Sequence, residues 1–261
     1  MIGRRQLTQV SRADVSRMHR SLAETPTAAN HALNLASAML TRAERWGLRP
    51  EGSNPCRNIE KFKEHSRQRF LSEVEIARLG VALAKAEQAG SPPSAIAAIR
   101  LLILTGCRKS EVLGLEWRWI DFERSLIELP DSKTGAKPIY LNAPAAVLLA
   151  GLPHLVDNSF VLPGERPGAH LVNVEKTWRR VRQAAGLDDV RLHDLRHSYA
   201  SVGASAGFSL PLIGALLGHA KMQTTERYAH LGNSPIRQAG EAIGARIAAA
   251  LVGPTDQKAA S

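Results

Sequence analysis

Residues 94–115, "SAIAAIRLLILTGCRKSEVLGL", form the stretch around which we expect the rest of the chain to fold. Residues 94–104 are nearly all apolar, which predicts a helix buried on most of its surface. Gly106 then breaks this helix, and a second helix is expected over 110–115. The turn between the two helices places an arginine, Arg108, directly against the buried helix.

Arg108 allows two interpretations. It can be a surface residue whose aliphatic stem covers apolar neighbours. Alternatively, a salt bridge to Glu111 holds the guanidinium rigid, which suits bidentate contact with a phosphate. The segment lacks the spacing of a phosphate-binding P-loop, and the chain lacks the glycine-rich dinucleotide fingerprint, so we expect no nucleotide cofactor.

The sequence before this stretch predicts a small helical region followed by a linker. A capping-box pattern of Ser11 and Asp14 opens a helix over 11–24. An Ala-rich helix follows over 27–46, with apolar residues at helical spacing: Ala32, Leu35, Ala36, Met39, Ala43 and Trp46. Residues 47–70 are rich in Gly, Pro and basic residues, as linkers are. We therefore expect a first region at 1–64 and a second domain at 65–261, whose first helix starts at the Ser72–Glu75 capping box.

The sequence after the stretch predicts a small sheet and then more helices. Strand patterns occur at 119–123, 126–130 and 137–141, and the last two flank "DSKTGA" with Gly135 as the turn residue. Lys133 lies in this turn, where most lysines are simply solvated. Helices resume near residue 173. The expected fold class is α+β, mainly helical, with one small three-stranded antiparallel sheet.

Composition narrows the class of partner. The chain has 34 Lys and Arg against 24 Asp and Glu, a formal net charge of +10, which is typical of proteins with a polyanionic partner such as nucleic acid. Cys56 and Cys107 match no metal or redox spacing. No run of 18 apolar residues or secretory signal pattern occurs, and we expect a cytoplasmic protein.

Residues 191–200, "RLHDLRHSYA", concentrate ionisable side chains. His193 and His197 have the spacing of a zinc pair, but Arg196 on the same helix would repel a dication. A solvated basic face is a second interpretation, although Leu192 and Leu195 flank it. An arginine and a histidine that together bind an oxyanion fit the residues better. Further along, "TTERYAHL" carries Tyr228, a poor nucleophile unless a base or cations assist it.

Taken in order, "TGCRKSEVLGLEW", "SKTGAKPIYL", "HDLRHSYAS", "LLGH" and "TTERYAH" resemble the tyrosine recombinases, the phage integrase family, over roughly residues 69–232. The "RFLS" and "RYAHL" segments are most similar to integrases of prophages and genomic islands. The resemblance implies a site-specific DNA recombinase that cleaves and rejoins strands through a 3′-phosphotyrosyl intermediate, in integration or excision of a mobile element. It implies no metal and no cofactor.

The resemblance also implies residue roles. Arg108 and Arg196 would grip the scissile phosphate, with His193 as proton acceptor and orienting group. Lys133 would protonate the leaving 5′ oxygen, and His219 would contact the phosphate. Tyr228 would be the nucleophile. His197 and Asp194 also match the motif and would have supporting roles. The linker arginines Arg67 and Arg69 would follow the DNA phosphates.

The resemblance further implies partners. These are a double-stranded attachment site, a homotetramer on DNA with a dimer per site, and DNA-bending or directionality proteins, with no membrane. An amphipathic helix over 234–252 would pack on a neighbouring protomer. The first region is shorter than the core-binding domain usual in the family, which suggests a truncated gene, a start codon assigned too late, or a minimal form. Two other activities stay open: strand relaxation like that of a type IB topoisomerase, and a remnant that only binds DNA.

Overall fold

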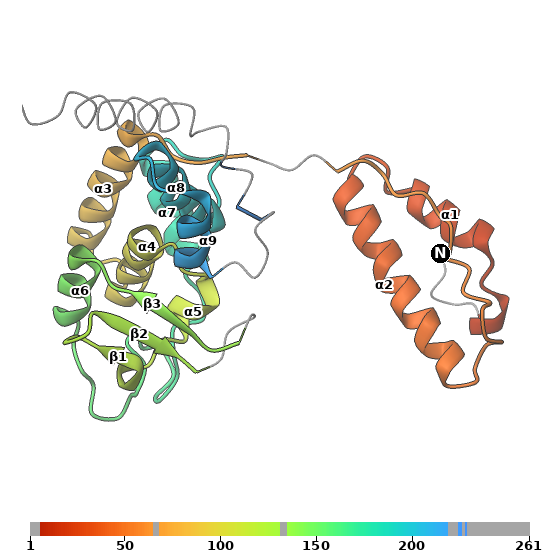
Figure 1. Cartoon of the computed structure of the whole chain (residues 1–261), viewed down its shortest axis with the longest axis horizontal. Coiled ribbons are helices and arrows are strands. Elements are labelled where there is room, and N and C mark those ends of the chain that lie inside the picture. The colour runs from red at the N-terminus through yellow and green to blue at the C-terminus, as the bar shows by residue number, and fades with distance from the viewer. Residues whose placement is uncertain (1–5, 65–67, 131–134, 219–223, 226–227, 229–261) are drawn as a thin grey trace, which may run out of the picture. The chain divides into compact units, whose positions relative to one another are not determined.

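The computed structural model describes residues 6–64, 68–130, 135–218, 224–225 and 228. The chain divides into two compact units, Met1–Gln68 and Arg69–Ser261, which are described separately. Figure 1 shows the helices of each unit and the three strands of the second.

The first unit is helical. A short 3-10 turn η2 (Leu7–Gln9) precedes α1 (Arg12–Arg20), which begins at the expected Ser11–Asp14 capping box, and α2 (Pro26–Arg45) packs against it. Buried Asn30 accepts a hydrogen bond from the backbone N–H of Phe62 and donates one to the Phe62 carbonyl, which fixes the following segment to α2. The core is small: Val10, Val15, Leu33, Leu40 and Cys56.

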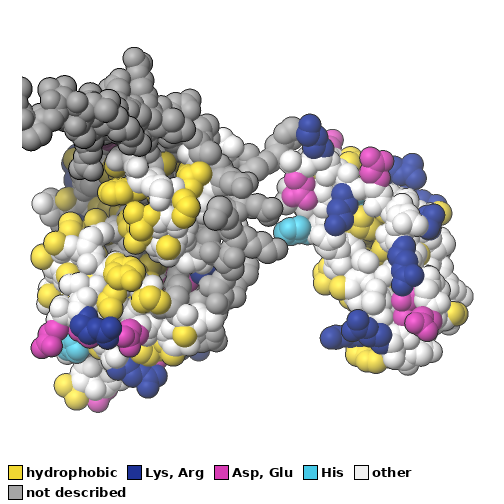
Figure 2. All heavy atoms as spheres, viewed as in Figure 1, with side chains coloured by type: hydrophobic (Ala, Val, Ile, Leu, Met, Phe, Trp, Pro, Cys, Tyr) yellow, Lys and Arg dark blue, Asp and Glu magenta, His cyan; other side chains and the backbone are white. Residues whose placement is uncertain are grey.

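The apolar face of α2 differs from the one that its spacing suggested. Leu35, Met39 and Trp46 are exposed, whereas Leu33 and Leu40 are buried. Many positions in the helix are Ala, which gives little contrast between faces, so the periodicity identified the helix but not its buried side. On the face drawn in Figure 2, Lys and Arg side chains are scattered along this unit.

The second unit is built around α4 (Pro93–Thr105), the helix expected from residues 94–104. Eight of its residues are buried, and it contacts α3 (Glu73–Gln88), α5 (Lys109–Leu113), α6 (Ala143–Ala150), α7 (Glu175–Ala184) and α8 (Leu192–Ser205). The last helix described, α9 (Leu210–Leu217), packs on α8. The large core of this unit includes Trp178, Leu187 and Leu195, all almost inaccessible to water.

The sheet is three-stranded and antiparallel in the order β1-β2-β3, as predicted. Its strands are β1 (Ile120–Asp121), β2 (Leu126–Leu129) and β3 (Lys137–Tyr140), and Ile127 pairs with both Ile120 and Ile139. The first strand is shorter than expected. Its expected first residue belongs to the 3-10 turn η3 (Trp117–Trp119). The strand ends at a turn in which the Arg124 N–H donates to the Asp121 carboxylate.

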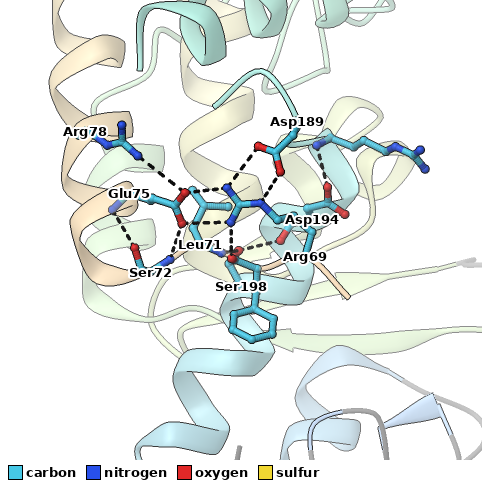
Figure 3. Close-up of polar contacts among 10 residues, drawn as sticks. Arg69, Leu71, Ser72, Glu75, Arg78, Asp189, Asp194 and Ser198 are labelled. Atoms are coloured by element: carbon cyan, nitrogen blue, oxygen red, sulfur yellow. Dashed lines mark hydrogen bonds and ion pairs between the residues drawn. The ribbon is translucent and has the colours of Figure 1, made fainter. Parts of the chain in front are cut away.

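Residues 69–72 fasten the start of the second unit to α8, as Figure 3 shows. The Leu71 N–H donates to Ser198 Oγ at 2.8 Å, and Ser198 in turn donates to the Asp194 carbonyl. The Arg69 guanidinium pairs with Glu75 at 2.6 Å and with Asp189 at 2.8 Å. Arg69 therefore braces the unit internally, which corrects the expectation that it follows DNA phosphates.

The Arg69–Glu75 pair predicts an acid-dependent loss of stability. The hydrogen bond from Arg69, followed by that from the Ser72 backbone, lowers the pKa of Glu75 from 4.5 to about 2. Stability from this carboxylate is present above about pH 4.5 and is lost as the pH falls towards 2. Both side chains keep about a fifth of their surface in water, so we expect Glu75→Gln to lower the unfolding free energy at pH 7 by about 1–2 kcal/mol.

The measurement is chemical denaturation of wild type and variant from pH 7 down to pH 2. The difference between the two should shrink below pH 4.5. Glu73→Gln is the matched control, because Glu73 lies exposed in the same first helical turn, and it should change stability by less than about 0.5 kcal/mol. Equal effects of the two variants would contradict the role of the pair.

Candidate functional site: two arginines and a tyrosine at helix ends

Arg108 sits where α4 ends and α5 begins. Gly106 caps α4 in the left-handed conformation, at φ 64°, and Arg108 is the N-cap residue of α5. Glu111 braces the arginine from both sides: one carboxylate oxygen accepts from the Arg108 N–H, and the other pairs with its guanidinium at 2.8 Å. A further guanidinium nitrogen lies 3.3 Å from the Gly218 carbonyl. The guanidinium is thus held rigid by Glu111, which is the second interpretation of Arg108 that the sequence allowed.

Arg196 comes from the first turns of α8 and is 4% exposed. Its Nη1 donates to the Gly106 carbonyl and its Nη2 to the Leu217 carbonyl, each at 2.6 Å. These carbonyls lie at the C-terminal ends of α4 and α9, where the helix dipole favours a cation. Burial, and then the nearby charge of Arg108, lower the pKa of Arg196 from its ordinary value. The two arginines therefore place two positive charges close together at the ends of two helices.

The N-terminus of α8 is fixed by Asp194, which accepts a hydrogen bond from the Arg191 N–H at 2.8 Å in a capping arrangement. This support matches the secondary role expected for Asp194. His193 is exposed one turn before the half-buried His197, and their rings meet edge to face with centroids 4.8 Å apart. Among the described residues, no group of three or more His, Cys, Asp or Glu side chains could hold a metal ion.

Tyr228 is 3% exposed and packs in an apolar cluster on α8 and α9. Its hydroxyl lies 2.6 Å from His197 Nδ1. The Tyr228 N–H donates to the Thr225 carbonyl, and the residue Thr225 is fully buried. Thr225 lies so close to α9 that a Cβ on Gly214 would come within 2.9 Å of its hydroxyl. Because Gly214 has no side chain, Thr225 can pack directly against α9.

A cavity of about 410 Å³ lies beside the start of α8. His193 and Trp178 line it together with three basic side chains and one acidic one: Lys109, Arg182, Arg191 and Glu175, of which Lys109 and Glu175 pair at 3.3 Å. Within the described residues, the buried Trp178 Nε1 and Arg182 Nε have no hydrogen-bond partner. Basic side chains outnumber acidic ones in the lining of the cavity, which favours an anion there.

Four of the six residues expected to act chemically are described: Arg108, His193, Arg196 and Tyr228. Lys133 and His219 lie outside the described residues, as does the expected helix over 234–252. Sequence reasoning missed the direct contact of His197 with Tyr228, because the four-residue spacing of the two histidines suggested a zinc pair and not a contact with the tyrosine. It also missed the backbone acceptors, whose only sequence signal is a glycine after each apolar helix, in "LTGC" and "LLGH".

Gly106→Ala tests how tightly the site is packed. Gly106 has a positive φ, and an added Cβ would lie 2.6 Å from the Tyr199 ring and 2.9 Å from Leu217. We expect this variant to lose about 2–3 kcal/mol in chemical denaturation. Gly90→Ala is the control, because Gly90 also has a positive φ but nothing lies within 4 Å of its added Cβ. Its loss should be about 1 kcal/mol, and equal losses would show that the close packing is absent.

Comparisons with known proteins identify the family and the fold of the chain. The model of the phage integrase family matches residues 69–234. The integrase of Salmonella phage P22 is 29% identical over 224 residues, which cover 80% of this chain and 55% of the phage protein. The chain thus spans just over half the length of that relative.

Two solved structures share the fold. The Tn1549 transposon integrase in complex with circular intermediate DNA superposes with a TM-score of 0.65 at 18% identity, covering 89% of this chain and 85% of that one. A lambda integrase dimer bound to a COC′ core site gives 0.63 at 18% identity, covering 86% and 81%. Since the family match extends over more than half of its residues, the chain belongs to the phage integrase family.

Proposed function

We propose that this chain is a tyrosine-type site-specific DNA recombinase that acts in the integration or excision of a mobile element. The proposal rests on one observation. Arg108 and Arg196 both bond to backbone carbonyls at the C-terminal end of α9, and Tyr228 packs against the same helix. Two fixed cations near a tyrosine suit a phosphodiester substrate, because they stabilise the negative charge on the phosphoryl oxygens as the tyrosine oxygen attacks phosphorus.

In the proposed reaction, Arg108 and Arg196 bind the non-bridging oxygens of the scissile phosphate. The Tyr228 oxygen bonds to phosphorus, the bond to the 5′ oxygen breaks, and Lys133 gives that oxygen a proton. His193 accepts the proton of the Tyr228 hydroxyl, and His193 and His219 orient the phosphate. The resulting 3′-phosphotyrosyl ester keeps the bond energy, so a 5′ hydroxyl of another strand can reverse the step without ATP.

The proposed partner is an attachment site in double-stranded DNA. The net charge of +10 supports this, as does the cationic cavity beside His193, which can take a neighbouring backbone phosphate. The division of the chain near residue 68 supports a first region, 1–64, that clamps DNA and a catalytic domain, 65–261. The lambda relative was crystallised as a dimer on its core site, which supports a dimer per site and a tetramer during strand exchange.

We also propose how the protein assembles and where in the cell it acts. The segment over 234–252 joins neighbouring protomers, and DNA-bending or directionality proteins assist. The protein works in the cytoplasm, associated with the nucleoid when bound to DNA. Within the part of the chain that the structure describes, none of the helices has the length and apolar character that a membrane crossing requires.

Covalent capture of DNA tests the proposed nucleophile. Wild-type protein is mixed with a pool of nicked duplexes of randomised sequence, from which a cleaved strand cannot be rejoined, and protein-linked strands are isolated under denaturing conditions and sequenced. We expect an adduct with wild type and none with Tyr228→Phe. Tyr140→Phe is the matched control, because Tyr140 is 63% exposed on β3, and it should react like wild type. An adduct that persists in Tyr228→Phe, or its absence from wild type, would refute the assignment.

Replacement of Arg196 by lysine tests the arginine pair. A lysine keeps the charge but cannot bond two helix-end carbonyls and a phosphate at once, so Arg196→Lys should slow adduct formation about a hundredfold or more. The rate is measured on a duplex recovered from the pool. Arg118→Lys, at a well-exposed position, is the control and should leave the rate within about twofold. Similar rates for the two variants would contradict the role of Arg196.

A further inference from the structure

Residues 69–71 are bonded to α8 at a point inside the helix. The Leu71 N–H donates to Ser198 Oγ at 2.8 Å, and both residues are buried. The Ser198 hydroxyl gives its one hydrogen to the Asp194 carbonyl at 2.7 Å, one helical turn back, so its lone pairs serve to accept from Leu71. Ser198 lies two residues after Arg196. The chain at Leu71 is thus bonded close to an arginine of the proposed reaction.

The same segment is bonded to the residues just before α8 (Figure 3). Two nitrogens of the Arg69 guanidinium donate to the Asp189 carboxylate, at 2.8 and 3.3 Å. Asp189 lies three residues before Leu192, where α8 begins. Its side chain keeps 56% of its surface in water, and an ion pair this exposed contributes little to stability. The more evident effect of the pair is to fix the position of the entering chain against the start of α8.

The chain that leads to Arg69 is also bonded to the first unit. Asn30, buried on α2, donates through its Nδ2 to the Phe62 carbonyl and to a carboxylate oxygen of Glu64, each at 2.8 Å. Four residues, 65–68, separate Glu64 from Arg69. A short stretch of chain therefore joins an anchor in the first unit to an anchor in the second.

We propose that Arg69 and Leu71 are positioning residues of the proposed recombination site. Through Asp189 and Ser198 they transmit to α8 the constraint that arises when the first region grips DNA. The inference rests on the proposed function. When both units bind one duplex, the DNA sets the path of the chain between the two anchors, and the position of residues 69–71 follows from it. The groups on α8 then reach their productive place when both units are bound, which ties cleavage to a full attachment site.

Small displacements of α8 matter for the chemistry. Arg196 donates to carbonyls of two other helices at 2.6 Å, so its guanidinium tolerates little movement. Catalytic groups need to be held within about 0.5 Å of their productive geometry, and a displacement of about 1 Å can cost on the order of a hundredfold in rate. His193 lies on the same turn of the helix and moves with it. A shift of about 0.5 Å transmitted from residues 69–71 would therefore change the rate about tenfold.

A double-mutant cycle of single-turnover adduct formation tests the inference. The substrate is a nicked duplex recovered from the pool, at saturating protein, so that the rate and not the affinity is compared. Asp189→Ala removes the carboxylate that binds Arg69, and an insertion of Gly-Ser-Gly-Ser after Gln68 lengthens the chain between the anchors. Each change alone should lower the rate about tenfold, and the two together no further, because both interrupt the same connection.

Asp188→Ala is the matched control, because Asp188 is the exposed neighbour and carries the same charge. It should leave the rate within about twofold of wild type, and the insertion should still slow this variant about tenfold. Two effects that multiply, or either change without effect on the rate, would overturn the inference, while the adduct itself upholds the proposed function. A wild-type protein that forms no adduct would refute both.

Hydrogen exchange without DNA checks the bond inside the helix. The Leu71 amide should exchange slowly, since it is buried and bonded to Ser198. In Ser198→Ala it should exchange about tenfold faster or more, whereas the amide of Ala200, buried on the same helix, should change far less. Rapid exchange of Leu71 in wild type, or an equal change at both amides, would overturn the inference, whatever the variants do to the rate.

Discussion

The burial of Arg196 between two helix ends is the constraint on which the site depends. A buried guanidinium without partners would cost several kcal/mol, so its position requires acceptors that are fixed in advance. The carbonyls of Gly106 and Leu217 supply them, and both are exposed to hydrogen bonding because a left-handed glycine ends each helix. Helices α4, α8 and α9 are thereby joined at one point by a single side chain.

The same arrangement prepares the site for an anion. Within the residues that the structure describes, two of the five N–H groups of Arg196 donate to carbonyls, and the other three have no acceptor there. Arg108 is bonded to the neighbouring carbonyl of Gly218 and paired with Glu111, so the protein holds the two like charges close together with one carboxylate beside them. A phosphate that binds between them relieves this repulsion. Its binding free energy is then available for the chemical step, because the cations need no reorganisation.

Much of this architecture could be predicted from the sequence, for physical reasons. Residues 94–104 predicted the buried helix because nearly every position is apolar, and Ser72 with Glu75 marked the start of α3 because a capping box needs those side chains. The Ala-rich α2 left its buried face undecided. The resemblance to the phage integrase family placed the two arginines and the tyrosine in one site, although their separation along the chain exceeds any local pattern.

Other features could not be predicted because the sequence does not encode them at single positions. The acceptors of Arg196 are backbone carbonyls, and a carbonyl is present at every residue. Arg69 resembled a phosphate contact because the linker around it is basic, but Glu75 and Asp189, far apart in the chain, meet at its guanidinium. The partner of the Tyr228 hydroxyl depends on tertiary packing, including the close approach of Thr225 to Gly214.

The most direct test of the central claim is NMR of the arginine guanidinium groups in the protein without DNA. If helix ends hold Arg196 in advance, its Nη protons give separate, slowly exchanging signals near neutral pH, and these signals are absent from Arg196→Lys. Rapid rotation and exchange of the Arg196 guanidinium, like that of a surface arginine, would contradict a site that is built before the DNA arrives.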